Sequence, residues 1–313
     1  MVKYLVKKIT SCLFTLFVII SITFFLMKAI PGDPFTQEKA LPKEILASLY
    51  EHYKLNDPLY VQYGNYLKSI VKFDLGPSFK YRGRSVNDII KNGFPISAIL
   101  GLEALAIALG VGLFLGCVGA LWQNQWQDWL AMLIAVIGIS VPSFIMASFL
   151  QYIFAIKLDW FPVARWGHFS QSVLPAISLA ALPCAFIARL VRSSMTEVLS
   201  MDYIKTARAK GVSQPLVIAR HAIKNSILPV VSYLGVLVAN ILTGSFVIEK
   251  IFGIPGLGGW FINSVTNRDY TVIMGITVFY SIILLSTIFF VDLLYSCIDP
   301  RIKLVKRTSG LKT

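Results

Sequence analysis

The sequence predicts an all-α protein that crosses a membrane six times. Of its 313 residues, 56% are hydrophobic and only 14% are charged, whereas soluble globular domains average about 45–50% apolar and about 25% charged residues. A hydrocarbon layer about 30 Å thick needs about 20 helical residues to span it. Backbone groups in lipid must be hydrogen-bonded within the segment, so long apolar runs are expected to be helices. Such runs cover residues 9–30, 96–122, 129–156, 173–191, 227–248 and 272–296.

The first run resembles a signal peptide in its basic start, because Lys3, Lys7 and Lys8 precede it. A signal-peptide core has about 7–15 apolar residues, and this run is longer. We therefore expect an uncleaved helix that begins in the cytoplasm. The fourth run is short and contains Pro175 and Pro183, which makes it the weakest of the six helix predictions.

The net charge of +13 follows from 29 Lys and Arg against 16 Asp and Glu. Membrane proteins concentrate basic residues in cytoplasmic segments, so this balance does not require nucleic acid as a partner. Residues 192–226 hold six basic residues, and the tail after Asp299 is also basic. We expect both termini and residues 192–226 in the cytoplasm. The chain then divides into a first helix (1–30), an external segment (31–95) and a core of five further helices with a cytoplasmic tail (96–313).

The external segment is expected to be partly helical. Pro42 stands where a helix can begin, and Asp57 is a candidate N-cap for a second helix. Two interpretations stay open for this amphipathic pair: it rests at the membrane interface, or it docks an external partner protein. The apolar positions at helical spacing are Ile45, Leu46, Leu49, Tyr50 and Tyr53, then Leu59, Tyr63, Tyr66 and Ile70.

Small residues line one face of the second run at four-residue intervals. Such a face lets two helix backbones approach closely, inside a bundle or against a partner subunit. The small residues are Ala104, Ala108, Gly112, Gly116 and Ala120. Three charges, Glu103, Arg189 and Asp292, lie near the ends of predicted helices, which favours snorkelling or local pairing over a role at the centre of the bilayer.

Signatures of catalysis are absent from the sequence. It has no phosphate-binding G-x-x-x-x-G-K-[ST] loop, no H-E-x-x-H pair, no G-x-S-x-G elbow and no paired cysteines. We therefore predict no catalytic residue, no metal site and no cofactor. Polar residues inside the runs either line a translocation path or bond neighbouring helices. The candidates for such a path are Ser140, Pro142, Asn240 and Ser245.

Residues 197–229 predict two short helices on the cytoplasmic side. Gly211 suits the left-handed conformation that ends the first helix, and Ser213 can cap the second. We expect Leu216, Ala219, Ile223 and Ile227 to form one apolar face of the second helix. This element either is pushed by a cytoplasmic partner or binds anionic lipid as a basic surface helix.

Several motifs resemble the permease subunits of ABC importers, in the oligopeptide, dipeptide and nickel branch and nearest to its oligopeptide B-type permeases. The resemblance extends over nearly the whole chain. It rests on Pro31-Gly32-Asp33-Pro34, Arg192-Ser193-Ser194-Met195, Thr206-Ala207-Arg208-Ala209-Lys210-Gly211, Arg220-His221-Ala222, Gly253-Ile254-Pro255-Gly256-Leu257-Gly258 and Asp299-Pro300-Arg301.

The resemblance implies a non-catalytic subunit in a multi-pass protein of the bacterial inner membrane. Such a subunit pairs with a second, homologous permease to form a channel for oligopeptides or dipeptides. An external substrate-binding protein delivers the peptide, and two cytoplasmic ATP-binding subunits drive transport. Nickel or another small solute is an alternative cargo, and an ion-coupled secondary transporter is a less favoured alternative class.

The resemblance also assigns roles to two segments. The ATPase-coupling loop comprises Asp202, Tyr203, Lys205, Thr206, Ala207, Arg208, Ala209, Lys210 and Gly211. The general importer pattern begins Glu-Ala-Ala, whereas this chain has Lys205-Thr206-Ala207 and so lacks the acidic residue. The second segment is a candidate external gate, with an ordinary tight turn as its alternative. It comprises Phe252, Gly253, Ile254, Pro255, Gly256, Leu257 and Gly258.

Overall fold

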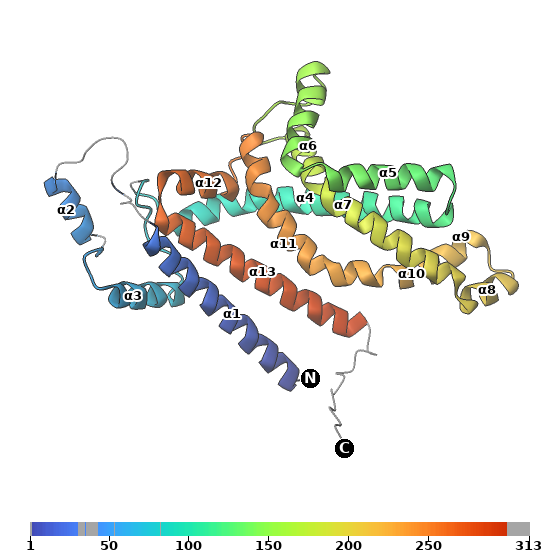
Figure 1. Ribbon diagram of the computed structural model, residues 1–313, viewed down its shortest axis with the longest axis horizontal. Coiled ribbons are helices and arrows are strands. Elements are labelled where there is room, and N and C mark those ends of the chain that lie inside the picture. Colours follow the sequence, from blue (N-terminus) through green and yellow to red (C-terminus); the bar gives the residue numbers. More distant parts are fainter. Residues whose placement is uncertain (1, 31–34, 36–42, 53, 82, 299–313) are drawn as a thin grey trace.

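The computed structural model describes residues 2–30, 35, 43–52, 54–81 and 83–298, and within them the chain is helical with no β-strand (Figure 1). The predicted all-α fold is confirmed. The helices in order are α1 (Val2–Ala29), α2 (Lys43–His52), α3 (Leu59–Val71), α4 (Val86–Leu121), α5 (Trp126–Ser140), α6 (Ser143–Leu150), η1 (Gln151–Lys157), α7 (Phe169–Ser200), α8 (Asp202–Ala209), α9 (Gln214–Val217), η2 (Ile218–Ala222), α10 (Ile223–Ser226), α11 (Leu228–Ile251), α12 (Leu257–Asn267) and α13 (Tyr270–Ile298).

The predicted membrane helices correspond to four long helices and two bent pairs. Helices α1, α4, α7 and α13 are each long and apolar enough to span a bilayer. Counting each bent pair as one span gives up to six crossings among the described residues. Helix α7 runs unbroken for 32 residues through Pro175 and Pro183, so the weakest of the six predictions is confirmed in a longer form.

The sequence predicted one straight helix for the third apolar run. The structure has two helices there, with a bend between them. Helices α5 and α6 meet at Val141-Pro142, and the chain turns there by 107°. Proline disfavours helical dihedrals in the residue before it, and Val141 is accordingly extended, with φ −95° and ψ 117°. Beyond α6 the chain continues as η1, a π-helix of seven residues. Apolar composition alone cannot indicate such a bend.

The small-residue face of α4 packs against α7 in this same chain. A Cβ at Gly112 would lie 2.8 Å from the Cys184 carbonyl oxygen, and one at Gly116 would lie 2.7 Å from that of Ala188. Ala104 and Ala108 are completely buried. Of the two interpretations left open, packing inside the bundle is therefore confirmed.

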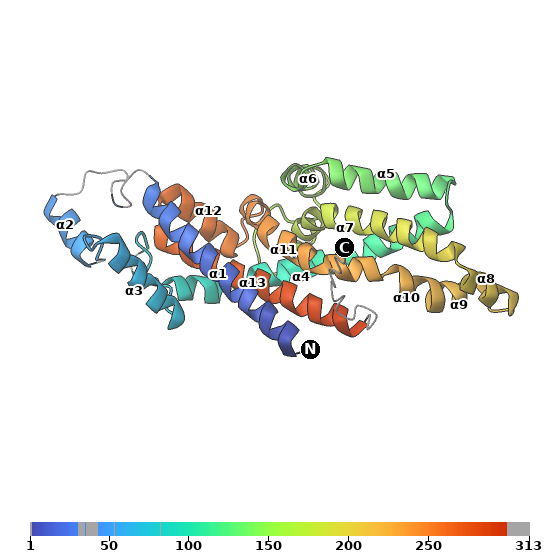
Figure 2. The same cartoon turned by 60° about the horizontal axis from the view of Figure 1, so that its bottom comes forward.

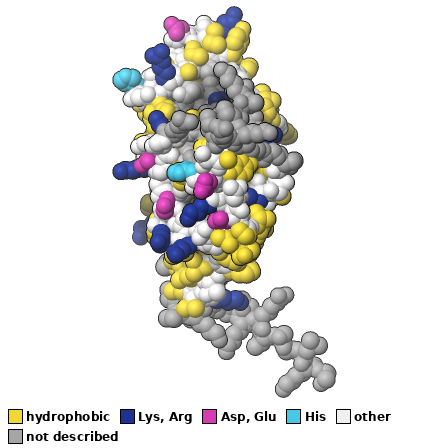
Figure 3. All heavy atoms as spheres, turned by 90° about the vertical axis from the view of Figure 1, so that its left-hand side faces the viewer, with side chains coloured by type: hydrophobic (Ala, Val, Ile, Leu, Met, Phe, Trp, Pro, Cys, Tyr) yellow, Lys and Arg dark blue, Asp and Glu magenta, His cyan; other side chains and the backbone are white. Residues whose placement is uncertain are grey.

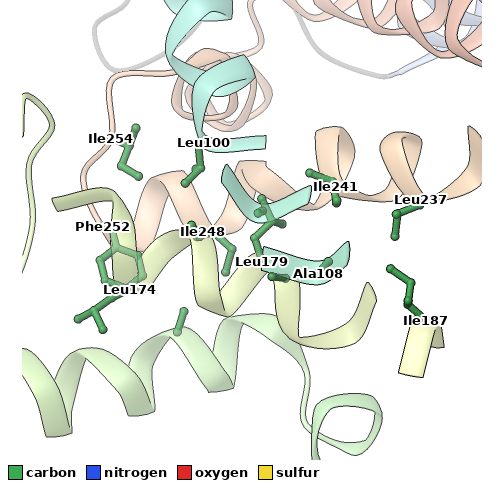
Figure 4. Packing of buried hydrophobic residues seen from close by; sticks show 14 of the residues in the cluster. Leu100, Ala108, Leu174, Leu179, Ile187, Leu237, Ile241, Ile248, Phe252 and Ile254 are labelled. Carbon is green, nitrogen blue, oxygen red and sulfur yellow. The ribbon is translucent and has the colours of Figure 1, made fainter. Parts of the chain in front are cut away.

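A single apolar core joins α4, α7 and α11 (Figure 4). Leu100 of α4, Leu179 and Ile187 of α7, and Ile248 of α11 are nearly or fully buried in it. Phe252, just beyond α11, belongs to the same cluster. The loop after α11 is thus anchored in the middle of the helix bundle.

The segment between α1 and α4 contains the two predicted short helices. The predicted cap is wrong, because the N-cap of α3 is Pro58 and the Asp57 side chain does not bond the helix. The aromatic face of α3 packs on α1: Tyr66 stacks on Phe24 at 5.5 Å between ring centroids, and the Tyr63 hydroxyl lies 2.6 Å from that of Ser21. These tyrosines pack the external segment against α1 of the same chain. Neither the membrane-interface interpretation nor the partner-docking interpretation predicted this contact. The position of Tyr53 lies outside the described residues.

The three charges near predicted helix ends behave differently from one another. Asp292 of α13 forms an ion pair with Lys8 of α1, so local pairing is confirmed there, and Figure 2 shows these two helices side by side. The Arg189 side chain is exposed. Glu103 is half-buried, and its Oε2 has no hydrogen-bond partner among the described residues.

Replacing Gly116 by alanine tests the α4–α7 contact. The new Cβ would meet Val191 and the Ala188 backbone, and overpacking of this kind costs about 1–3 kcal/mol. We expect a lower unfolding temperature for the detergent-solubilised protein, measured by intrinsic fluorescence. Gly110→Ala is the matched control, since no atom lies within 4 Å of a Cβ in that position of α4. Equal unfolding temperatures for the two variants would contradict the packing described here.

Candidate coupling element and gate

Helix α8 lies at one extremity of the molecule, beyond the end of α7 (Figure 1). Helix α7 continues through Glu197 to Ser200, so the first predicted short helix begins later than expected. Met201 is extended, with φ −67° and ψ 148°, and separates α7 from α8. The short helix ends at Ala209, close to the predicted end at Lys210.

Two buried side chains fix α8 to the rest of the chain. Ile204 is completely buried and Ala207 is 9% exposed. Both pack in a cluster with Met195 and Val198 of α7 and with Val217 of α9. Ala207 is therefore an anchor and not part of an exposed surface. The predicted coupling residues with exposed side chains or backbone are Asp202, Tyr203, Lys205, Thr206, Arg208, Ala209, Lys210 and Gly211.

Gly211 reverses the chain after α8 in the predicted left-handed conformation, with φ +79°. Its surroundings are open, because no heavy atom lies within 4 Å of a Cβ built there. The requirement for glycine at this position is therefore conformational and not steric.

The second short helix has a different buried face from the predicted one. Leu216 is 49% exposed, and the buried residues are Val217, Ala222 and Ser226. The difference begins at Leu216, before η2. The π-helical turn η2 takes more residues per turn than an α-helix and accounts for the five-residue spacing between the buried Val217 and Ala222. Ser213 occupies the N-cap position as predicted, but its side chain makes no capping hydrogen bond.

An ion pair between a buried carboxylate and a partly exposed guanidinium, which sequence reasoning missed, joins α5 to α7 near this end. The Arg192 guanidinium donates two hydrogen bonds to the Asp128 carboxylate, each 2.6 Å long. The Asp128 side chain is 5% exposed. The Asn124 backbone N–H also donates to this carboxylate, at 2.9 Å. The sequence signal for this ion pair was the position of Asp128, an acidic residue directly before the apolar run 129–156.

The candidate gate at the opposite end is more than a turn. An eleven-residue helix, α12, lies between α11 and α13, and the sequence analysis did not predict it. Phe252, Ile254 and Leu257 are buried at 1%, 3% and 0% exposure. Gly253 and Pro255 are exposed beside a hollow of about 380 Å³. Figure 3 views the molecule from the end that carries α2 and α3. On this face, charged side chains of both signs lie among apolar side chains.

Asp269 joins the start of α13 to a distant loop. Its carboxylate is completely buried and accepts hydrogen bonds from the Ser78 hydroxyl and from the Phe79 backbone N–H, the latter at 3.2 Å. It also accepts from the Val272 N–H in the first turn of α13, at 3.4 Å. One carboxylate thus ties α13 to the loop that precedes α4.

The candidate path residues that the structure describes differ in their surroundings. Ser140 and Pro142 are exposed at the bend between α5 and α6. Ser245 of α11 is 1% exposed, and its hydroxyl donates to the Leu242 carbonyl at 2.9 Å. The Asn240 side chain lies outside the described residues. In the described part of the chain, no three His, Cys, Asp or Glu side chains gather as a metal site would require.

These features define a multi-pass helical membrane protein with a short helix anchored beyond one end of its bundle. The chain belongs to the family described as binding-protein-dependent transport system inner membrane component, whose model matches residues 108–304. The N-terminal model described as binding-protein-dependent transport system membrane component matches residues 1–101. The resemblance inferred from the motifs is confirmed, as is the expected location in the inner membrane.

Curated relatives match over nearly the whole chain. The dipeptide transport system permease protein DppB of Bacillus subtilis is 52% identical over 307 residues, which cover 98% of this chain and all of the relative. The oligopeptide transport system permease protein OppB of Haemophilus influenzae is 44% identical, over 97% of this chain and all of the relative.

A solved structure supports the fold independently. It is described as a crystal structure of an amino acid ABC transporter with histidines, and it aligns with a TM-score of 0.54. The alignment covers 67% of this chain and 94% of that chain at 17% sequence identity. At this identity the likeness concerns the fold alone.

The Arg192→Ala variant tests the ion pair. It leaves the Asp128 carboxylate buried without its partner, which costs about 3 kcal/mol in such sites. We expect a large loss of stability in chemical denaturation, and partial recovery in the double variant with Asp128→Ala. Asp202→Ala removes an exposed pair with Lys205 and serves as the control, with stability near that of the parent. An Arg192→Ala protein as stable as this control would refute the assignment.

Proposed function

We propose that this chain is a channel-forming permease subunit of an ATP-driven importer of dipeptides or oligopeptides. The observation that carries the proposal is the full-length match to dipeptide and oligopeptide permeases at 44–52% identity. The names of these relatives favour peptides over nickel as cargo. In this proposal the chain performs no catalysis itself, and ATP is hydrolysed by two separate subunits.

The proposed importer contains four further components. A second, homologous permease completes the channel with this chain, and an external substrate-binding protein delivers the peptide. Two ATP-binding subunits bind on the cytoplasmic side. With both termini in the cytoplasm, α8 faces the ATP-binding subunits, and the segment between α1 and α4 faces the binding protein.

Helix α8 is the proposed contact with an ATP-binding subunit. Ile204 and Ala207 anchor it to α7, α9 and η2. Force applied to α8 therefore reaches the membrane helix α7 by direct packing, and it reaches α11 through α9, η2 and α10, which precede α11 in the chain. The exposed surface of α8 and the neighbouring α9 combines basic side chains with Tyr203 of α8 and Leu216 of α9, which are 42% and 49% exposed. Apolar and basic side chains together suit a protein groove better than a lipid surface, where apolar residues would share one helix face.

Transport then follows from two arrangements of the helix bundle. The ATP-bound and ATP-free forms of the ATP-binding subunits bind α8 with different free energies. This difference shifts the equilibrium between the inward-open and outward-open forms of the bundle. The 252–258 loop and α12 act as the gate at the other end. The proposal retains the predicted division of the chain into a first helix (1–30), an external segment (31–95) and a permease core with its cytoplasmic tail (96–313).

Peptide uptake in a strain that lacks this chain tests the function. We expect the restored strain to take up labelled dipeptides and oligopeptides only while ATP is available, and two ATP-binding subunits to co-purify with the chain. Leu216→Glu places a charge on the proposed contact and is expected to reduce the co-purified ATPase at unchanged membrane levels of the chain. Uptake driven by the purified chain alone, with an ion gradient, would overturn the proposal.

The Gly211→Val variant tests the role of the turn after α8. Because space is open around this residue, only its φ of +79° opposes a β-branched side chain. We expect at least a tenfold loss of peptide uptake, with ATP hydrolysis retained and the helices still inserted.

Two controls separate coupling from general strain. Gly211→Asn keeps access to the left-handed region and should retain most uptake. Gly83→Val introduces similar strain at φ +75°, also in open space, at the opposite end of the molecule, and should leave coupling intact. Normal uptake by the Gly211→Val protein would count against the proposed lever.

A further inference from the structure

A carboxylate is buried at the end of α11 beside the start of α12. Glu249 has no exposed surface, although it lies only two residues before the end of its helix. Its Oε2 accepts a hydrogen bond of 2.7 Å from the backbone N–H of Gly258, in the first turn of α12. Helix N-termini attract negative charge, so this contact favours the carboxylate in a site removed from water.

A side chain from a third helix holds the neighbouring amide. The Leu257 backbone N–H donates to the Ser97 hydroxyl of α4 at 2.9 Å. The first two amides of α12 are therefore bound by side chains of α11 and α4. Helix starts usually satisfy these amides with a residue of the same segment. Here they fasten α12 to two membrane helices.

The glycines of the 252–258 loop make this contact possible. A Cβ at Gly256 would overlap both Glu249 Oε2 and Ser97 Oγ. A Cβ at Gly258 would lie 2.8 Å from Glu249 Oε2 and would also overlap the backbone of Phe246. The Gly-Leu-Gly sequence is thus shaped around the carboxylate, which supports the assignment independently of the hydrogen bonds.

The carboxylate has further polar neighbours, but it forms no ion pair with any residue that the structure describes. The hydroxyls of Ser245 and Tyr280 lie beside it. Glu249 Oε1 and the Tyr280 hydroxyl are buried without a hydrogen-bond partner among the described residues. Lys250 is directed elsewhere, since its ammonium donates to Asn263 Oδ1 at 3.0 Å. A buried carboxyl group with one oxygen lacking a hydrogen-bond partner is poorly explained by fold stability alone.

Helix α11 connects this site to the coupling element. It begins at Leu228, directly after α8–α10, and ends at Ile251, directly before the 252–258 loop. We propose that Glu249 and Ser97 form a latch that fixes the N-terminus of α12 to α11 and α4. Movement of α11, started at α8, then carries the start of α12 with it. Glu249 is a positioning residue in this scheme, which rests on the proposed transport function.

Hydrogen–deuterium exchange in the assembled importer tests the latch without reference to transport. In Glu249→Ala, peptides that cover residues 255–261 should exchange at least tenfold faster than in the parent, while peptides within 270–290 keep their protection. Ser97→Ala, a milder change, should accelerate the same peptides to a smaller extent. Glu51→Gln, on exposed α2, is the control. Unchanged exchange in 255–261 for both latch variants would refute the latch.

The ratio of ATP hydrolysed to peptide imported tests the role of the latch in coupling. We expect Glu249→Ala to raise this ratio at least tenfold, and Glu249→Gln, which keeps an acceptor oxygen, to raise it less. Faster exchange in 255–261 with a parental ratio would refute the coupling role. Failure of the proposed function has a different signature, because the parental importer would then import no peptide at all.

Discussion

The close contact between α4 and α7 is the constraint on which the remaining structure depends. Lipid is as apolar as leucine, so membrane helices associate through close packing more than through exclusion of water. Gly112 and Gly116 let α7 approach until its Cys184 and Ala188 carbonyl oxygens lie where a larger residue of α4 would place its Cβ. The position of α7 in turn sets the place of α8, because only the extended Met201 separates the two helices.

Buried carboxylates organise the junctions between helices. The three buried acidic residues among those described are Asp128, Glu249 and Asp269. Asp128 and Asp269 lie at the starts of α5 and α13, and the carboxylate of Glu249, from the end of α11, lies against the start of α12. The field of a helix N-terminus and its free N–H groups offset the cost of removing a carboxylate from water. Each carboxylate also contacts a segment distant in sequence, so it joins elements that apolar packing alone would allow to slide.

The proposed machinery consists of a rigid body between two specialised ends. Helices α4, α7 and α11 share one apolar core, and the loop after α11 inserts Phe252 and Ile254 into it. Short and irregular elements, including both described π-helices, gather where the long helices end or bend. In the proposed mechanism, such a division carries a displacement that starts at α8 through α11 to the start of α12.

The sequence by itself determined the helical class, the number of apolar segments, the glycine turn at Gly211 and the family, because each depends on local composition or on contiguous motifs. Only the tertiary structure decided the bend at Val141-Pro142, the buried face of α9–α10, the existence of α12 and the partners of Asp128 and Glu249. A bend or a π-turn changes the direction of every later side chain while leaving composition unchanged. The partner of a buried charge, likewise, lies on another helix, 64 residues away for Asp128 and Arg192, and no local pattern specifies that distance.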